Sequence, residues 1–382
     1  MMEKDMDYYR IFSEIDPVIE SILVKAYEGK EISSGEAYEL LNLEGRLVWP
    51  LLYTADIVRQ RLVGNIVSFV VNRNINFTNM CENRCLFCAF RVDEGDKDSY
   101  FYSINRIVSM AKEAWKRGAT EVCIQGGCKK GLKIEFYAEI LREIKRELPD
   151  IHIHAFSPQE VFQGSISSGI TVEEGLKILK EEGLDTMPGT AAEILDDEVR
   201  MKVCPQKVNT KTWIKIIKTA HSLGIKTSST IMYGHIENNW HRKKHLNILR
   251  DIQKETGGFT EFVPLPFIHI NTPLYKQESS ASGSSGMEDL KLYAVSRLFF
   301  ANYINNIQAS WVKLGPKLVQ VVLCAGGNDL GGTLYGENIS KAAGATYGEE
   351  KTPKELREMI RAIKRIPSQR TTDYKILKMF NE

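Results

Sequence analysis

The spacing of hydrophobic positions changes near residue 65. Before that point apolar residues recur every three or four positions, as in 16–27 and 48–63, which predicts helices. After it, short β-branched runs alternate with amphipathic helical segments, and this alternation predicts parallel β-α units with right-handed crossovers. The runs expected to form strands are 66–79, 121–127, 151–157, 187–190, 226–234, 259–267, 306–314 and 321–327.

Eight such units predict an α/β protein with a (βα)8 TIM-type barrel or a closely related partial barrel. A doubly wound open sheet is the alternative, but the G-x-G-x-x-G fingerprint that often follows its first strand is absent. We expect an N-terminal helical extension over 1–62, the barrel over 63–335 and a C-terminal helical tail over 336–382. The Ser- and Gly-rich stretch 276–289 is either a lid over the barrel mouth or a plain surface loop.

Charge and hydropathy narrow the class of protein. Lys and Arg number 50 and Asp and Glu number 49, so the formal net charge of +1 gives no electrostatic reason to expect nucleic-acid binding. No apolar run reaches the ~20 residues that span a bilayer, which argues against a membrane protein. The first ten residues, MMEKDMDYYR, do not resemble a secretory signal. We therefore expect a cytoplasmic protein.

The cysteines introduce the chemistry. The chain has 7 of them, and an odd number in a large chain favours a reducing compartment over a disulfide framework. Cys81, Cys85 and Cys88 lie close together in NFTNMCENRCLFCAF, directly after the first predicted strand. Active sites of barrels lie at the carboxyl ends of the strands, so this segment is expected at the mouth. The cysteines expected to be buried thiols are Cys123, Cys204 and Cys324.

Three close-set thiolates favour an iron–sulfur cluster. A cubane cluster ordinarily takes four thiolates, so three leave one iron open to a small molecule with an amine and a carboxylate. The amino-acid end of S-adenosylmethionine presents that pair. A structural zinc site would need a fourth ligand, and no second C-x-x-C or H-x-H pair supplies one. Three unrelated core cysteines are a weaker alternative, because Glu82, Asn83 and Arg84 lie between them.

The Cys81, Cys85 and Cys88 motif, with the aromatic Phe87 before its last cysteine, resembles the radical S-adenosylmethionine superfamily. From about residue 60 to about residue 350 the chain is similar to the branch that makes deazaflavin and menaquinone precursors. Within that branch it most resembles the tyrosine-using subunits of deazaflavin (Fo) synthase, the ribitylaminouracil–tyrosine 4-hydroxyphenyl transferases. The segments that carry the likeness are NFTNMCENRCLFCAF, EVCIQGG, HIHAFSPQEV, MPGTAAEIL, TSSTIMYGHIE, EFVPLPFIHINTPLY, NIQASWVKLG and CAGGNDLGGTLYGENIS.

The resemblance implies a specific reaction. A reduced 4Fe–4S cluster on the three cysteines would cleave S-adenosylmethionine to a 5′-deoxyadenosyl radical, and that radical would take a hydrogen from L-tyrosine. The Cα–Cβ bond of the tyrosine would break, and the 4-hydroxybenzyl fragment would join 5-amino-6-(D-ribitylamino)uracil, a step towards Fo and coenzyme F-420. The implied partners are a companion radical subunit of Fo synthase and a reducing electron donor. A futalosine-pathway enzyme of the same branch and a non-catalytic cluster-binding module are the alternatives.

Further candidates lie at the predicted strand ends. Glycines at a strand end allow a close approach of the backbone to a ligand. An ordinary strand-to-helix turn is the alternative, and the placement at the strand end favours the cofactor role. The expected S-adenosylmethionine contacts are Phe87, Gln125, Gly126, Gly127, Ser157 and Glu160.

A polar ring at the mouth is expected to hold the substrates, because hydrogen-bonding side chains recur at most strand ends. Each member has a simpler alternative as a cap, a turn residue or a buried histidine. The members of this ring are His154, Thr190, Glu193, Ser229, Thr230, Tyr233, His235, His269, Asn271, Gln308, Ser310, Asn328 and Asp329. Cys128, Lys129 and Lys130, which follow Gly127, have no assigned role.

Overall fold

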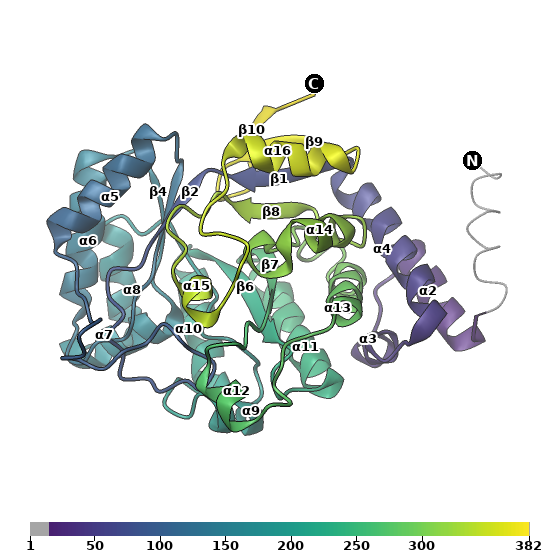
Figure 1. The fold of residues 1–382 in the computed structure, drawn as a ribbon, viewed down its shortest axis with the longest axis horizontal. Coiled ribbons are helices and arrows are strands. Elements are labelled where there is room, and N and C mark those ends of the chain that lie inside the picture. The colour runs from purple at the N-terminus through teal and green to yellow at the C-terminus, as the bar shows by residue number, and fades with distance from the viewer. Residues whose placement is uncertain (1–14, 382) are drawn as a thin grey trace.

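The computed structural model describes residues 15–381 and begins with a group of helices. These are α2 (Pro17–Tyr27), α3 (Ser34–Leu41), a 3-10 turn (Gly45–Leu47) and α4 (Val48–Val63). Ser33 and Glu36 form the capping box that opens α3. The group packs beside α11 and α13 at one end of the molecule (Figure 1). Residues 1–14 of the predicted extension lie outside the described residues.

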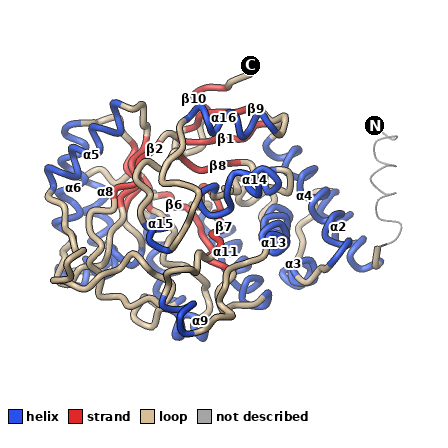
Figure 2. The backbone as a smooth tube through the Cα atoms, viewed as in Figure 1, coloured by secondary structure: helices blue, strands red, loops and turns tan. Residues whose placement is uncertain are grey.

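A six-stranded parallel sheet forms the centre of the fold (Figure 2). Its order follows the chain: β2 (Asn72–Ile75), β3 (Glu121–Ile124), β4 (His152–Ala155), β5 (Thr186–Met187), β6 (Lys226–Tyr233) and β7 (Phe259–Pro266). The connecting helices lie outside the sheet because each has one apolar face to bury. They are α5 (Ile104–Lys116), α6 (Ile134–Glu147), α7 (Pro158–Ser168), α8 (Val172–Glu181), α9 (Asp197–Val203), α10 (Thr210–Ser222) and α11 (Asn239–Thr256).

A second sheet continues from the first, because only Val71 separates β1 (Ile66–Val70) from β2. Its order is β10 (Ile376–Met379), β9 (Ile366–Arg370), β1 and β8 (Asp329–Gly332). Two isolated parallel bridges, Phe262–Ile307 and Gln308–Asp329, connect β7 to β8 through residues 307–308. The remaining helices are α12 (Pro273–Gln277), α13 (Gly286–Phe299), α14 (Trp311–Leu323), α15 (Ile339–Ala343) and α16 (Pro353–Ala362).

The last two predicted strands are wrong in part. Only Ile307 and Gln308 of 306–314 make strand bridges, and helix α14 begins at Trp311. Residues 321–323 of the predicted strand 321–327 belong to the same helix, and the true strand is β8. A short apolar run does not distinguish a strand from a buried helix. Cys324, expected to be buried, is exposed at the end of α14.

The predicted helical tail is also only partly helical. After α15 and α16 the chain forms β9, which pairs in parallel with β1, and β10, which pairs antiparallel with β9. The last residue of β9 and the turn that follows it form a segment that we call the C-terminal plug, residues 370–374. The Thr372 hydroxyl donates to Glu121, the first residue of β3, at 2.6 Å.

The C-terminal plug is held by buried charges at the amino ends of the strands, opposite the mouth. The Arg370 guanidinium contacts the Asp329 carboxylate at 2.5 and 2.9 Å, and Asp329 is the first residue of β8. The Tyr374 hydroxyl donates to Glu261 in β7. This end of a barrel usually contributes stability rather than catalysis.

The stretch 276–289 lies against the carboxyl end of β6. Ala281 is fully buried, and the Ser284 hydroxyl donates to Asp289 at 2.5 Å. A side chain on Gly234 would come within 2.5 Å of the Ser284 amide nitrogen, so glycine is required for this contact. Whether the loop acts as a lid stays a prediction. No helix within residues 15–381 is long and apolar enough to cross a bilayer.

Candidate active site

The carboxyl ends of β2, β3, β4 and β5 bring four loops together at one edge of the sheet. Because the strands are parallel and adjacent, the segments that follow them meet there. The loop after β2 carries the three clustered cysteines, and residues 125–128 follow β3. Residues 156–160 follow β4 and open helix α7, while residues 188–193 follow β5.

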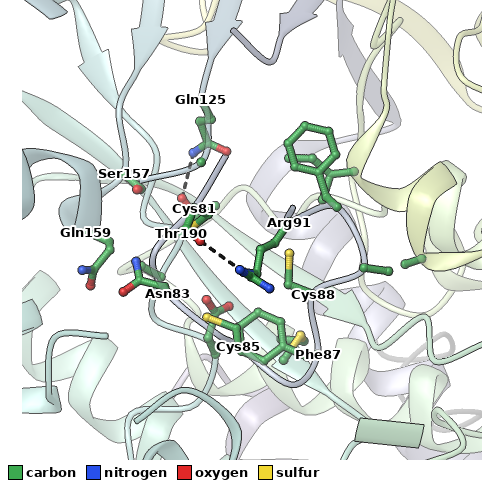
Figure 3. A pocket seen from close by; sticks show the side chains of 18 of the residues that line it. Cys81, Asn83, Cys85, Phe87, Cys88, Arg91, Gln125, Ser157, Gln159 and Thr190 are labelled. Atoms are coloured by element: carbon green, nitrogen blue, oxygen red, sulfur yellow. Dashed lines mark hydrogen bonds between the residues drawn. The ribbon is translucent and has the colours of Figure 1, made fainter. Parts of the chain in front are cut away.

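Backbone hydrogen bonds fix the cysteine loop. The Glu82 amide donates to the Cys128 carbonyl at 2.9 Å, and the Leu86 amide donates to the Val203 carbonyl at 2.8 Å. The Arg91 guanidinium donates to the Cys81 carbonyl at 3.1 Å (Figure 3). The loop is therefore attached to the β3 side and to helix α9 independently of any bound group.

These loops enclose a cavity of about 250 Å³. That space is many times the ~10–15 Å³ that a single water requires, so it is large enough for small molecules. Figure 3 shows side chains from several strand ends pointing into it. Of the residues predicted from the sequence, the cavity is lined by Cys81, Cys85, Cys88, Phe87, Gln125, Gly126, Gly127, Ser157, Glu160, Thr190 and Glu193.

Two glycines at the end of β3 allow the cysteine loop to approach closely. A side chain on Gly127 would lie 2.2 Å from the Met80 carbonyl oxygen and 3.0 Å from the Cys81 Cβ. One on Gly126 would lie 2.6 Å from the Phe77 ring. Non-bonded contacts of a Cβ atom are essentially never this short, so both positions require glycine for steric reasons.

Glu160 connects the ends of β3 and β4. Its carboxylate accepts from the Gly126 amide at 2.9 Å and from the Ser157 amide at 2.7 Å. Ser157 and Glu160 also form the capping box of α7. Burial raises the pKa of Glu160 to about 7, although these hydrogen bonds favour the charged form. The backbone of the glycine turn is therefore held by this side chain.

A buried ion pair lies at the cavity wall after β5. Lys207 and Glu193 are in contact at 2.5 Å, and the Lys207 ammonium lies 5.3 Å from the centre of the Phe87 ring. The Arg200 guanidinium donates to the carbonyls of Ala191 and Ala192, which orders the backbone before Glu193. Gln125 donates to the Thr190 hydroxyl at 2.8 Å across the same wall.

The backbone around the cavity is strained. Phe156, Ala191 and Glu193 have positive φ angles of 55°, 62° and 44°. Residues other than glycine rarely adopt this conformation, and when they do they concentrate at functional sites. All three lie just beyond the ends of β4 and β5.

The three clustered thiols differ in their surroundings. Hydrogen bonding from the Cys128 thiol lowers the pKa of Cys81 to about 6, with help from the backbone amides of Cys128 and Asn83. Burial instead raises the pKa of Cys85 and of Cys88. Cys128, which had no role in the sequence-based interpretation, thus lies beside a predicted ligand.

The donor set of the cavity fits an iron–sulfur cluster with a small polar ligand. Three of the thiols that line the cavity come from one loop, and thiolates are the usual ligands of such clusters. The buried Nδ2 of Asn83, between two of them in the sequence, has no hydrogen-bond partner among residues 15–381. An unpaired donor at a cavity wall is suited to an acceptor on a bound molecule.

The other predicted substrate residues do not line this cavity. Ser229 donates to the Glu261 carbonyl in β7 at 2.7 Å, and Thr230 donates to the Gly189 carbonyl just after β5 at 2.9 Å. Tyr233 donates to Asp289 at 2.8 Å, and His154 lies 2.7 Å from the Thr186 hydroxyl in the interior. Burial lowers the pKa of His154 to about 4, so this ring is neutral.

The residues of the predicted polar ring that follow β6 and β7 also contact other parts of the protein. His235 lies 3.2 Å from the Met232 carbonyl, and the His269 ring packs on Tyr275 with centroids 4.5 Å apart. Asn271 is exposed and donates to the Ala342 carbonyl.

The last group belongs to the closing side of the fold. Gln308 donates to Glu261, Asn328 accepts from Arg297, and Asp329 binds Arg370. Ser310 precedes α14 without a side-chain cap. A substrate role for these residues stays a prediction.

Sequence reasoning missed several residues of the cavity. Asn83 and Gln159 flank predicted residues and were not singled out, and Lys207 and Lys313 lie on segments without a chemical motif. Lys207 lies in an irregular segment, where a lysine is usually a solvated surface residue, and Lys313 lies near the end of the predicted strand 306–314, so nothing in the pattern distinguished these two.

Comparison with known families agrees with this geometry. Residues 75–249 match the family model of the radical SAM superfamily, and residues 256–382 match that of the CofH/MqnC C-terminal region. A 5-amino-6-(D-ribitylamino)uracil–L-tyrosine 4-hydroxyphenyl transferase of Methanocaldococcus jannaschii is 54% identical over 92% of this chain and 98% of its own length. The transferase of the same name from Methanothermobacter thermautotrophicus is 51% identical over 93% and 96%.

Solved structures support the fold. The FeFe-hydrogenase maturase HydG from Carboxydothermus hydrogenoformans has a TM-score of 0.75 at 17% identity, covering 97% of this chain and 84% of its own. Methylornithine synthase (PylB) has a TM-score of 0.72 at 19% identity, covering 91% and 97%. The chain thus belongs to the radical SAM superfamily and, within it, to the family of the 5-amino-6-(D-ribitylamino)uracil–L-tyrosine 4-hydroxyphenyl transferases.

Proposed function

We propose that this chain is a radical transferase that cleaves the side chain of L-tyrosine and joins its 4-hydroxybenzyl fragment to 5-amino-6-(D-ribitylamino)uracil. The single observation that carries the proposal is 54% identity to a transferase named for these substrates, over 92% of the chain. The cavity supports it, because its wall combines thiols, hydrogen-bonding groups and aromatic rings.

Cys81, Cys85 and Cys88 would hold the 4Fe–4S cluster, with one iron left for S-adenosylmethionine. When bound, the reduced cluster and S-adenosylmethionine together supply a carbon-centred radical that removes hydrogen from the substrate. The backbone at Gly126 and Gly127, fixed by Glu160, would approach the amine of the cofactor. Phe87, Gln125 and Ser157 would complete its contacts.

The apolar part of the wall would exclude water from the reaction. Phe90, Met232, Phe267, Ile268 and Ile339 line the cavity beside the cysteine loop. A carbon radical would attack most nearby C–H bonds, so selectivity depends on holding the target hydrogen in contact and keeping other molecules out. Thr190 and Glu193 are the predicted substrate residues that lie on this wall.

The proposal also covers the closed barrel, its two extensions, the partners of the chain and its compartment. Residues 307–308 would serve as the seventh strand of a (βα)8 barrel, because their bridges connect β7 to β8. The barrel would span 63–335 between an extension over 1–62 and a tail over 336–382. A companion radical subunit of Fo synthase and a reducing electron donor would act with the chain in the cytoplasm.

The test is an anaerobic reconstitution. The protein is loaded with iron and sulfide, reduced, and mixed with S-adenosylmethionine, L-tyrosine and 5-amino-6-(D-ribitylamino)uracil. Mass spectrometry follows 5′-deoxyadenosine and a hydroxybenzyl–uracil adduct. The proposal expects both products, each dependent on tyrosine, and neither from C88A.

The alternatives give different results. The C-terminal region matches a family model named for both CofH and MqnC, so a futalosine-type substrate is the second candidate. Cleavage of S-adenosylmethionine without the adduct would favour that candidate. Absence of cleavage with a fully loaded cluster would favour a non-catalytic cluster-binding module.

A further inference from the structure

Lys313 stands out among the basic residues of the cavity. Three basic side chains line it, and two are already engaged: Arg91 donates to the Cys81 carbonyl and Lys207 pairs with Glu193. Lys313 makes no side-chain hydrogen bond or ion pair with any of residues 15–381. An ammonium group at a partly buried wall is costly unless a partner compensates its charge.

The two carboxylates that act electrostatically on Lys313 are both bound to other groups. Glu337 and Glu193 are the carboxylates whose charge acts on it. Glu337 accepts from the Ser340 amide at 2.6 Å and from the Asn74 amide group, while Glu193 pairs with Lys207. Burial lowers the pKa of Lys313, as expected for an ammonium group without a direct counter-ion.

The backbone under Lys313 is fixed. The Lys313 amide donates to the Ser310 carbonyl at 3.1 Å, which closes the first turn of α14. The Trp311 indole is buried and donates to the Gly332 carbonyl at 2.9 Å. Gly315, with φ 76° and ψ 165°, ends this turn with a kink. The ammonium is thus presented from an anchored turn.

We propose that Lys313 binds the α-carboxylate of the amino-acid substrate. This inference rests on the proposed function, in which tyrosine is that substrate. The ribitylaminouracil has no carboxylate. The carboxylate of S-adenosylmethionine would bind, together with its amine, at the iron that three thiolate ligands leave open, which is beside Cys81, Cys85 and Cys88. Lys313 then remains as the cation for the carboxylate of tyrosine, the other molecule in the cavity with an amino-acid end.

In this role Lys313 holds tyrosine by its α-carboxylate. The tyrosine side chain is then free to extend along the apolar wall of the cavity. A charge-assisted hydrogen bond of this kind contributes about tenfold to a hundredfold in affinity. Tyramine, which is tyrosine without its carboxylate, gains nothing from it and serves as the matched probe.

The experiment measures binding rather than turnover. Protein carrying its cluster and S-adenosylmethionine is kept oxidised, so that no reaction starts, and the Kd values of L-tyrosine and tyramine are measured by anaerobic equilibrium dialysis. Wild type should bind tyrosine about tenfold to a hundredfold more tightly than tyramine. K313M should lose this preference through weaker tyrosine binding, with an unchanged Kd for tyramine and unchanged iron content.

Two control variants separate a specific contact from a general disturbance. K317M changes an exposed lysine one turn further along α14 and should keep the full preference. K313R retains the positive charge and should keep most of it. A K313M protein that keeps the preference, or that weakens both ligands equally, overturns the assignment of Lys313.

The two levels of the proposal fail differently. If wild type makes the hydroxybenzyl–uracil adduct while K313M still prefers tyrosine, only the assignment of Lys313 falls. If fully loaded wild type binds neither tyrosine nor tyramine, the proposed function and the assignment fall together.

Discussion

Replacement of Arg370 by methionine tests the buried ion pair of the C-terminal plug. The side chains of Arg370 and Asp329 are 2% and 0% exposed, and their two contacts measure 2.5 and 2.9 Å. Methionine keeps much of the apolar stem but leaves the Asp329 carboxylate without its counter-ion. Removing one partner of a buried pair costs about 3–5 kcal/mol of unfolding free energy.

The expected change in melting temperature follows from the size of the chain. For a cooperative transition of 382 residues the unfolding entropy is about 0.8 kcal/mol/K, so R370M should melt about 4–6 °C below wild type. Circular dichroism of the anaerobic, cluster-loaded protein measures this shift. R142M is the control, because the Arg142–Glu182 pair has similar two-point contacts at the surface and should change the melting temperature little.

A double variant tests whether the effect arises from the pair. D329N/R370M removes both charges, so it should melt less far below wild type than the sum of the two single changes. An R370M protein that melts within about 1 °C of wild type would show that the pair contributes little and would refute this reasoning.

Three further predictions concern the cluster site and pH. Replacing Cys81, Cys85 or Cys88 by alanine should abolish cluster absorbance and S-adenosylmethionine cleavage, whereas C123S, C204S and C324S should keep their iron; a fully loaded C85A would remove that residue as a ligand. G127A should lower iron content, because the new side chain would meet the Met80 carbonyl at 2.2 Å, while G286A, with no contact under 3.9 Å, should load normally. Glu261 has its pKa raised by burial from 4.5 to about 7, so it keeps its proton where the unfolded chain releases it, and its contribution to stability falls as pH rises through that interval. The melting temperature of E261Q relative to wild type should therefore rise from about pH 5 to about pH 8, and a constant difference would contradict the assignment of that proton.

Local features of the fold were predictable from the sequence. Helix α4 spans the predicted 48–63, and capping boxes open α3 at Ser33–Glu36 and α8 at Thr171–Glu174. A cap depends on two side chains three residues apart, so its information lies within one turn. The parallel sheet was predictable in a similar way, because each strand and each helix is recognised from a short local pattern, and their alternation implies parallel strands.

Features that depend on distant residues were not predictable. Asp329 reads as a polar strand-end residue, but its function in the fold is decided by Arg370, which is 41 positions away. Lys313 and Lys207 enter the cavity because of tertiary packing that no periodicity describes. Residues 311–314 and 321–323 of α14 were expected in strands, because a short apolar run does not by itself distinguish a strand from a buried helix. That Val322 and Leu323 are buried while the adjacent Val321 is exposed is apparent only in the structure.

Likewise, the cysteine triad was placed at the mouth from its position after the first strand, and all three side chains do line the cavity. Of the predicted polar ring, Thr190 and Glu193 line this cavity, and a substrate role for the other members stays a prediction. Polar residues on parallel strands divide between the mouth, the interior and backbone hydrogen bonds, and the sequence does not reveal which of these a given residue satisfies.

The C-terminal plug has a consequence for the order in which the protein folds. Ile66 pairs with Ile366, so the first strand waits for about 300 residues of synthesis before this neighbour exists. At ~5–20 residues per second that interval is about 15–60 s, and β1 lacks its β9 neighbour throughout it. A chain that terminates early would lack Arg370, Thr372 and Tyr374, and would leave Asp329, Glu121 and Glu261 without those partners. Completion of this sheet therefore waits for the synthesis of residues 366–374.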